Sequence, residues 1–198
     1  GETAEARLKR MAMRSWRRGT KEMDLVLGPF ADAHLAGLSE ADLATYDALL
    51  EAARQARDHI HLEYYIYTPD RSGTALRDAL LERARAGIKV RLLLDAVGSS
   101  RTPRSFFADL LAAGGELAWF HPMRLGRVWE RPWLNLRTHR KIVVIDGCIG
   151  FAGGINITDD ENDRLRADAY RDLHLRIEGD AVQALQLVFV EDWVYATG

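Results

Sequence analysis

The stretch His59-Ile-His-Leu-Glu-Tyr-Tyr-Ile-Tyr67 alternates with a period of two. Successive side chains of an extended chain point to opposite faces. One face therefore carries Ile60, Leu62, Tyr64 and Ile66, and the other carries His59, His61, Glu63 and Tyr65. The pattern predicts a strand whose apolar face lies in the core. We expect His59 and His61 to pack or to form hydrogen bonds, because histidine is often partly buried.

Helices and strands alternate on both sides of this stretch. Ser39 and Asp42 resemble a capping box before a helical apolar pattern that runs to about Arg57. Beyond the stretch, the patterns predict a helix over 73–86, a buried strand over 88–94, a helix from Thr102-Pro103 to Gly114-Gly115, and a strand over 116–120. This order predicts an α/β fold with a mixed, largely parallel sheet flanked by helices on both faces.

The second half of the chain begins with a hairpin signal over residues 141–152. Two apolar runs flank Asp146-Gly147, a pair that suits the positive φ angles of a type I′ turn. Residues 172–177 alternate again and predict a strand, and Asp180 is a candidate cap for a C-terminal helix. Because no repeat or linker is evident, we expect a basic segment at 1–24 and a single domain over 25–198.

The composition is typical of a globular domain. Of the 198 residues, 47% are apolar and 28% are charged, which excludes a disordered or low-complexity chain. The single cysteine, Cys148, excludes an internal disulfide and a cysteine-rich zinc site. The net charge is −2, so any attraction to an anionic partner must come from a local patch.

Two stretches form such basic patches. Residues 7–21 carry seven basic side chains and no acidic one, which is compatible with an amphipathic helix on an anionic surface or with a solvated helix. Residues 122–141 carry six basic side chains against Glu130 alone. The second stretch leads directly into the motif that carries the chemistry.

That motif is Thr138-His-Arg-Lys-Ile-Val-Val-Ile-Asp-Gly147. In an extended strand His139 and Lys141 project from the same face, whereas Asp146 projects from the other. An imidazole beside a fixed ammonium suits attack on phosphorus, because the cation offsets charge that builds on the phosphoryl oxygens. The position of Asp146 in the turn favours a role in fixing the hairpin over contact with a substrate.

Three groups of residues together carry a family resemblance: His139-x-Lys141-x4-Asp146, Gly153-Gly154-x-Asn156 and Tyr170-Arg171-Asp172-x-His174. They resemble the phospholipase D superfamily, and residues 25–195 are most similar to the N-terminal half of a bacterial cardiolipin synthase. The resemblance implies a phospholipase D-like fold and a two-step phosphodiester transfer that uses no metal or other cofactor. One histidine would form a phosphohistidine, and a second would move the proton of the leaving and incoming hydroxyl groups.

The resemblance also implies roles for single residues. The catalytic set is His139, as nucleophile or acid/base partner, Lys141, which would hold phosphate oxygens, and Asp146 as third member of the motif. The substrate-binding set is Asn156, Arg137 and Glu63, and Glu63 is also a candidate for orienting an imidazole. The orienting set is Asp172 and His174, and the sequence equally allows His174 to be a structural histidine. No residue is assigned to a metal.

Members of this superfamily need two such motifs, and the 198 residues contain one His-x-Lys pair. We expect the first half of a two-motif enzyme, with the other motif supplied by a C-terminal half or by a symmetric second copy. The predicted function is a cardiolipin synthase-type phosphatidyltransferase that acts between phosphatidylglycerol molecules at the cytoplasmic membrane of a bacterium. Two alternatives stay open: a homodimeric phospholipase D or nuclease, and a non-catalytic module that binds lipid or another anion. Nucleic acid is the less expected partner.

Overall fold

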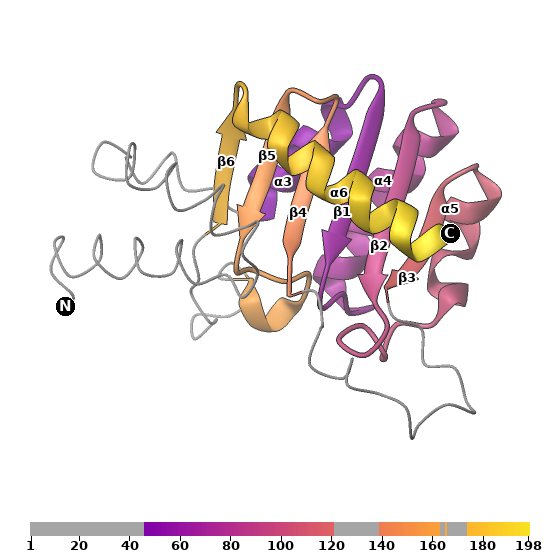
Figure 1. The fold of residues 1–198 in the computed structure, drawn as a ribbon. Helices are drawn as coiled ribbons and strands as arrows, with labels where there is room; N and C mark the ends of the chain where they lie inside the picture. Colours follow the sequence, from indigo (N-terminus) through magenta and orange to yellow (C-terminus); the bar gives the residue numbers. More distant parts are fainter. Residues whose placement is uncertain (1–45, 121–138, 163–164, 166–173) are drawn as a thin grey trace, which may run out of the picture.

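The computed structural model describes residues 46–120, 139–162, 165 and 174–198. They form a six-stranded sheet with helices on both faces (Figure 1). The strand order is β3-β2-β1-β4-β5-β6, with β1 (His59–Tyr64), β2 (Lys89–Asp95), β3 (Glu116–Phe120), β4 (Lys141–Ile145), β5 (Ile149–Gly153) and β6 (His174–Glu178). The helices are α3 (Tyr46–Gln55), α4 (Arg71–Arg85), α5 (Ala108–Ala112) and α6 (Ala181–Thr197), with 3-10 turns η3 (Arg104–Phe107) and η6 (Asp159–Glu161). The basic segment expected at 1–24 lies outside the described residues.

The sheet has a parallel half and an antiparallel half. β1, β2 and β3 are parallel neighbours, connected through α4 and through η3 with α5, as the alternating sequence pattern predicts. The pairs β1–β4, β4–β5 and β5–β6 are antiparallel. Over the described strands the sheet is therefore mixed, as expected, but it is not largely parallel. The tight turn at Asp146-Gly147 can join only antiparallel strands.

The β4–β5 turn has the geometry that its sequence predicts. Asp146 has a φ of 54° and Gly147 a φ of 64°, and the Cys148 backbone N–H donates to the Ile145 carbonyl at 3.0 Å. Positive φ at both central residues is typical of a type I′ turn, whose twist matches that of the flanking strands. Cys148 is exposed beside this turn.

The apolar face of β1 lies in the core, as predicted, and packs toward α3 and α4. Ile60, Leu62 and Tyr64 are at most 1% exposed and share a core with Leu76 and Leu80 of α4. Complete burial of a side chain of this size contributes about 1.5–3 kcal/mol to stability. This packing fixes β1 at the centre of the sheet.

The opposite face of β1 lies under α6, which crosses the sheet (Figure 1). His61 is 8% exposed, its ring stacks on Phe189 with 4.6 Å between centroids, and Gln186 Nε2 donates to its Nδ1 at 2.8 Å. Gln186 Oε1 also lies 3.1 Å from His59 Nε2. The packing and hydrogen-bonding roles expected for both histidines are confirmed. Burial lowers the pKa of His61 to about 4.

Two helix starts and one expected capping bond differ from the sequence prediction. Thr102 is not an N-cap, because its hydroxyl donates to the Tyr67 carbonyl and the first turn begins after Pro103. Asp180 precedes α6 but makes no side-chain capping bond. Helix α4 begins earlier than expected, because Asp70 Oδ1 accepts from the Gly73 backbone N–H at 3.0 Å and caps it.

Candidate active site at the carboxyl edge of the sheet

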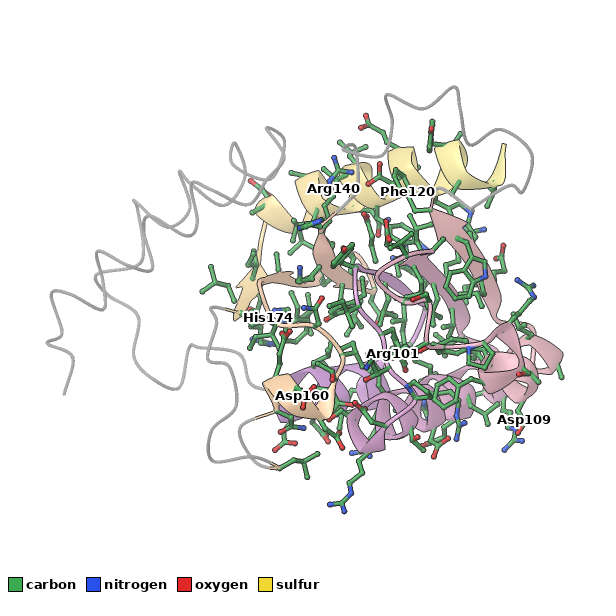
Figure 2. The ribbon with its side chains drawn as sticks, turned by 90° about the horizontal axis from the view of Figure 1, so that it is seen from below. Arg101, Asp109, Phe120, Arg140, Asp160 and His174 are labelled. Carbon is green, nitrogen blue, oxygen red and sulfur yellow. The ribbon has the colours of Figure 1, made fainter. Side chains whose placement is uncertain are left out.

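Residues of the motifs meet at one edge of the sheet, where β1, β2 and β5 end and β4 and β6 begin. Tyr64 pairs with Lys141, and Gly153 pairs with His174. Continuing the β4–β5 register by one residue sets Lys141 opposite Gly153. Lys141 and His174 therefore lie in one row on the strands that flank β5, with about 10 Å between their backbones. Figure 2 looks onto this edge, where His174 is labelled.

Lys141 is held at the start of β4. Its Nζ donates to the His139 carbonyl at 2.9 Å and lies 5.7 Å from the centroid of the Tyr65 ring. The residue is 8% exposed. An ammonium with so little solvent around it interacts more strongly with a nearby anion than a surface lysine does. Lys141 is therefore suited to holding a phosphate oxygen.

His139 lies two residues before the first residue of β4 and is exposed. Its ring stacks on that of Tyr65, with 4.2 Å between the centroids and 27° between the planes. The imidazole is thus supported by a neighbouring strand end while it stays accessible. An accessible, supported imidazole beside Lys141 is the arrangement that attack on phosphorus needs.

Arg140, between these two residues, points away from them. It forms an ion pair with Asp192 of α6, and the two side chains are 12% and 14% exposed. Figure 2 shows Arg140 beside α6. The charge of Arg140 therefore anchors this segment to α6 and is neutralised there.

Asn156 follows β5 and is 7% exposed. Its Oδ1 accepts from the Ile66 backbone N–H at 3.1 Å, and its Nδ2 donates to Glu161 Oε1 at 2.8 Å. The backbone N–H of Asn156 donates to the other oxygen of Glu161 at 2.6 Å. The side chain is therefore held in one orientation at the same edge as Lys141.

Asp146 lies at the opposite end of β4. Its carboxylate accepts from the backbone N–H groups of Arg57, Asp58 and His59 at 2.8–3.2 Å. It lies five positions beyond Lys141 along the strand, a distance of about 16 Å. The structure does not bring Asp146, the third member of the motif, to the edge where Lys141 and His174 lie, because Asp146 fastens the hairpin to the start of β1.

Glu63 is 1% exposed and lies on the face of β1 that α6 covers, next to Leu93 in the strand register. Lys141 pairs with Tyr64 and so lies on the other face. Glu63 therefore lies beneath α6, on the other face of the sheet from Lys141, and its assignment to the substrate-binding set stays a prediction. Alternation in the sequence identifies the face of Glu63 but does not reveal that a helix covers it.

His174 is the first residue of β6 and is 5% exposed, with its ring 6.2 Å from that of Phe151. Its burial fits a positioning role or a structural one. Asp172 and Arg137 lie outside the described residues.

The sequence suggested no role for the residues of the loop that follows β2. Asp95 Oδ1 accepts from the backbone N–H groups of Val97 and Gly98, both at 2.9 Å. Ser99 Oγ donates to the Tyr65 carbonyl and accepts from the Tyr67 N–H, both at 3.0 Å. A Cβ atom on Gly98 would lie 2.2 Å from the Tyr65 carbonyl oxygen, so a side chain is excluded there. The loop holds the backbone of Tyr65, and with it the ring that supports His139.

Glu161 was missed as well. It lies in the acidic run 159–161, which reads as an exposed turn, and nothing in its spacing from Asn156 distinguishes it from its neighbours. Over the described ranges, no group of three His, Cys, Asp or Glu side chains is placed to hold a metal ion.

Comparison with known families matches residues 49–193 to the model described as cardiolipin synthase, PLD-like domain. A second model, described as flavinator of succinate dehydrogenase, matches residues 9–59. Cardiolipin synthase 1 of Bacillus cereus is 43% identical over 171 residues, which cover 86% of this chain and 33% of that protein. Cardiolipin synthase of Geobacillus thermodenitrificans is 46% identical over 158 residues, which cover 78% of this chain and 30% of that protein. The chain thus spans about a third of the length of these curated relatives.

Solved structures share the fold at low sequence identity. Nuc from Salmonella typhimurium, described as a phospholipase D family member, has a TM-score of 0.54 at 18% identity, with 74% of this chain and 85% of that chain covered. NucT from Helicobacter pylori has a TM-score of 0.51 at 15% identity, with 76% of this chain and 87% of that chain covered.

Proposed function

The chain belongs to the family of cardiolipin synthase, phospholipase D-like domains, and we propose that it is one motif-bearing domain of a phosphatidyltransferase. The enzyme would move a phosphatidyl group from one phosphatidylglycerol to a glycerol hydroxyl of another through a phosphohistidine. The observation that carries the proposal is the meeting of His139, Lys141 and Asn156 at one sheet edge.

In the first half of the reaction, an imidazole nitrogen attacks the phosphorus of phosphatidylglycerol. A nitrogen–phosphorus bond forms, and the bond from phosphorus to the headgroup glycerol oxygen breaks. A second histidine donates a proton to that oxygen, and glycerol leaves. His139 takes one of these two histidine roles, and its counterpart comes from a second motif.

In the second half, a glycerol hydroxyl of another phosphatidylglycerol attacks the phosphohistidine. The histidine that gave up its proton now removes one from this hydroxyl, and the nitrogen–phosphorus bond breaks. Both histidines return to their starting states. Lys141 offsets charge on the phosphoryl oxygens in both halves, and Asn156 donates a hydrogen bond to the same group.

The second motif would lie in another domain of the same protein or in a second copy of the chain. A two-fold arrangement would set two His-x-Lys edges face to face. His174 and Asp172 would orient the imidazole of the site, with Asp172 as acceptor of its Nδ1 proton. Arg137 would add attraction for the anionic headgroup.

A phospholipid substrate would require the reaction to take place at a membrane surface, and the bacterial source of the cardiolipin synthase relatives supports a bacterial membrane. The membrane that we propose is the cytoplasmic one. The basic segment within residues 1–24 would contact anionic lipid there. Among the helices that the structure describes, none is long and apolar enough to cross a bilayer.

The test is to trap the intermediate. The protein is mixed with vesicles that contain phosphatidylglycerol radiolabelled at its phosphorus and is quenched in alkali. It is then assayed for label on protein that is stable to base and labile to acid. We expect label on the parent protein, an altered amount on His139→Ala, and parental labelling of His59→Gln, which changes a histidine at the opposite end of β1. His139→Ala that labels and turns over like the parent would refute the proposal. Turnover of a labelled DNA substrate without turnover of lipid would favour the nuclease alternative.

A further inference from the structure

The carboxylate of Glu161 holds Asn156 through two hydrogen bonds. Oε2 accepts from the Asn156 backbone N–H at 2.6 Å, and Oε1 accepts from Asn156 Nδ2 at 2.8 Å. Each carboxylate oxygen therefore has a donor on the same residue. Bonds of this kind, in which one partner is ionised, are about twice as strong as neutral ones.

The two ends of the Asn156 amide face partners of opposite kinds. Oδ1 accepts from the Ile66 backbone N–H at 3.1 Å, whereas Nδ2 faces the carboxylate of Glu161. A rotation of the amide by 180° would set Oδ1 against a carboxylate and Nδ2 against an N–H group, and both contacts would be repulsive. The ionised Glu161 thus fixes which end of the amide donates.

The turn that carries Glu161 is itself fastened to the N-terminus of α4. Asp159 Oδ1 accepts from the Ser72 backbone N–H at 2.8 Å, and the Asp159 backbone N–H donates to Asp70 Oδ2 at 2.8 Å. Asn162 Nδ2 donates to Ser72 Oγ at 3.0 Å. The backbone that carries Glu161 is therefore fastened to α4 by the residues on either side of the turn, Asp159 and Asn162.

From this geometry we propose that Glu161 is a positioning residue for phosphate recognition and that it acts through Asn156. The inference rests on the proposed function of the site. Asn156 Nδ2 has two hydrogens, and Glu161 takes one of them. Because Ile66 and Glu161 fix the plane of the amide, the second hydrogen of Nδ2 also has a fixed direction, and it donates to a phosphoryl oxygen. The two N–H donors of Asn156 offset part of the negative charge of Glu161 and so weaken its repulsion toward the phosphate.

A double-mutant cycle tests this coupling. kcat/KM for phosphatidylglycerol in vesicles and the inhibition constant of inorganic phosphate are measured for Glu161→Gln, Asn156→Ala and the double variant. A glutamine keeps the shape of the side chain but has one acceptor oxygen, and it lets the Asn156 amide rotate. We expect Glu161→Gln to lower kcat/KM and weaken phosphate inhibition by about tenfold in the parent protein, as for loss of part of a charged hydrogen bond. In the Asn156→Ala background, Glu161→Gln should leave both kcat/KM and the inhibition constant of phosphate almost unchanged.

The control is Asp160→Asn, which removes the same charge from an exposed neighbour in η6 and leaves both values at the parental level. Thermal unfolding of each variant separates loss of folded protein from loss of phosphate affinity. Two outcomes would overturn this inference but not the proposed function of the site. One is an equal loss from Glu161→Gln in both backgrounds. The other is parental values in Glu161→Gln while Asn156→Ala is impaired. Parental values in Asn156→Ala would instead overturn the phosphate role of Asn156, and the inference with it.

Discussion

The ring of Tyr65 stacks on the ring of His139, with 4.2 Å between their centroids. Tyr65 follows β1, and its carbonyl accepts from Ser99 Oγ. The imidazole is therefore positioned by a segment that a separate loop holds in place. The end of β1, the loop after β2 and the segment before β4 thus come together at the accessible ring of His139.

Replacement of Tyr65 tests whether stacking matters for the reaction. We expect Tyr65→Leu to slow formation of the phosphohistidine by about tenfold, because loss of an aromatic pair worth ~0.5–1.5 kcal/mol frees the imidazole to rotate. Tyr65→Phe keeps the ring and should stay within about twofold of the parent. The measurement is the single-turnover rate of label transfer to protein over a range of pH. Equal rates for the Leu and Phe variants would show that the ring contributes nothing.

Removal of the Lys141 charge should have a larger effect. Lys141→Met keeps the length of the side chain but not the ammonium, and we expect kcat to fall by about 10²–10³, as for loss of an oxyanion-stabilising donor. Lys89→Met is the matched control, since Lys89 is exposed at the opposite end of β2. Steady-state turnover of phosphatidylglycerol vesicles measures both. A Lys141→Met variant as active as its control would remove Lys141 from the reaction.

Asp146 should affect stability rather than turnover. Asp146→Ala leaves three backbone N–H groups of residues 57–59 without their carboxylate, and we expect a loss of about 2–3 kcal/mol in the free energy of unfolding. Denaturant titration measures this loss, and kcat per folded molecule should stay near the parental value. A variant of unchanged stability and greatly reduced kcat would return Asp146 to the catalytic set.

His61 predicts a dependence of stability on pH. Burial lowers its pKa from 6.5 to about 4 in the folded protein, so the unfolded chain binds more protons between these values. The contribution of neutral His61 is fully present above pH 6.5 and is lost as the pH falls toward 4. We expect the urea midpoint to fall over that window, and to fall less steeply in His61→Gln. Parallel profiles for the two proteins would contradict a buried neutral His61.

Local patterns predicted the elements whose structure depends on near neighbours. The alternation of residues 59–67 identified the face of β1 that packs toward α3 and α4, and Asp146-Gly147 identified the hairpin turn. Thr102 was misassigned as a cap because its hydroxyl bonds to Tyr67, 35 residues away. The burial of Glu63 and the clamp of Glu161 on Asn156 also arise from tertiary packing, so no spacing in the sequence reveals them.

The β4–β5 turn offers an experimental handle. Cys148, the one cysteine of the sequence, is exposed beside that turn, at the opposite end of β4 from Lys141. A maleimide fluorophore attached to its thiol would sit about 16 Å or more from the catalytic edge. The parent protein can therefore be labelled at a single thiol, without prior mutagenesis, to follow its arrival at lipid vesicles in real time.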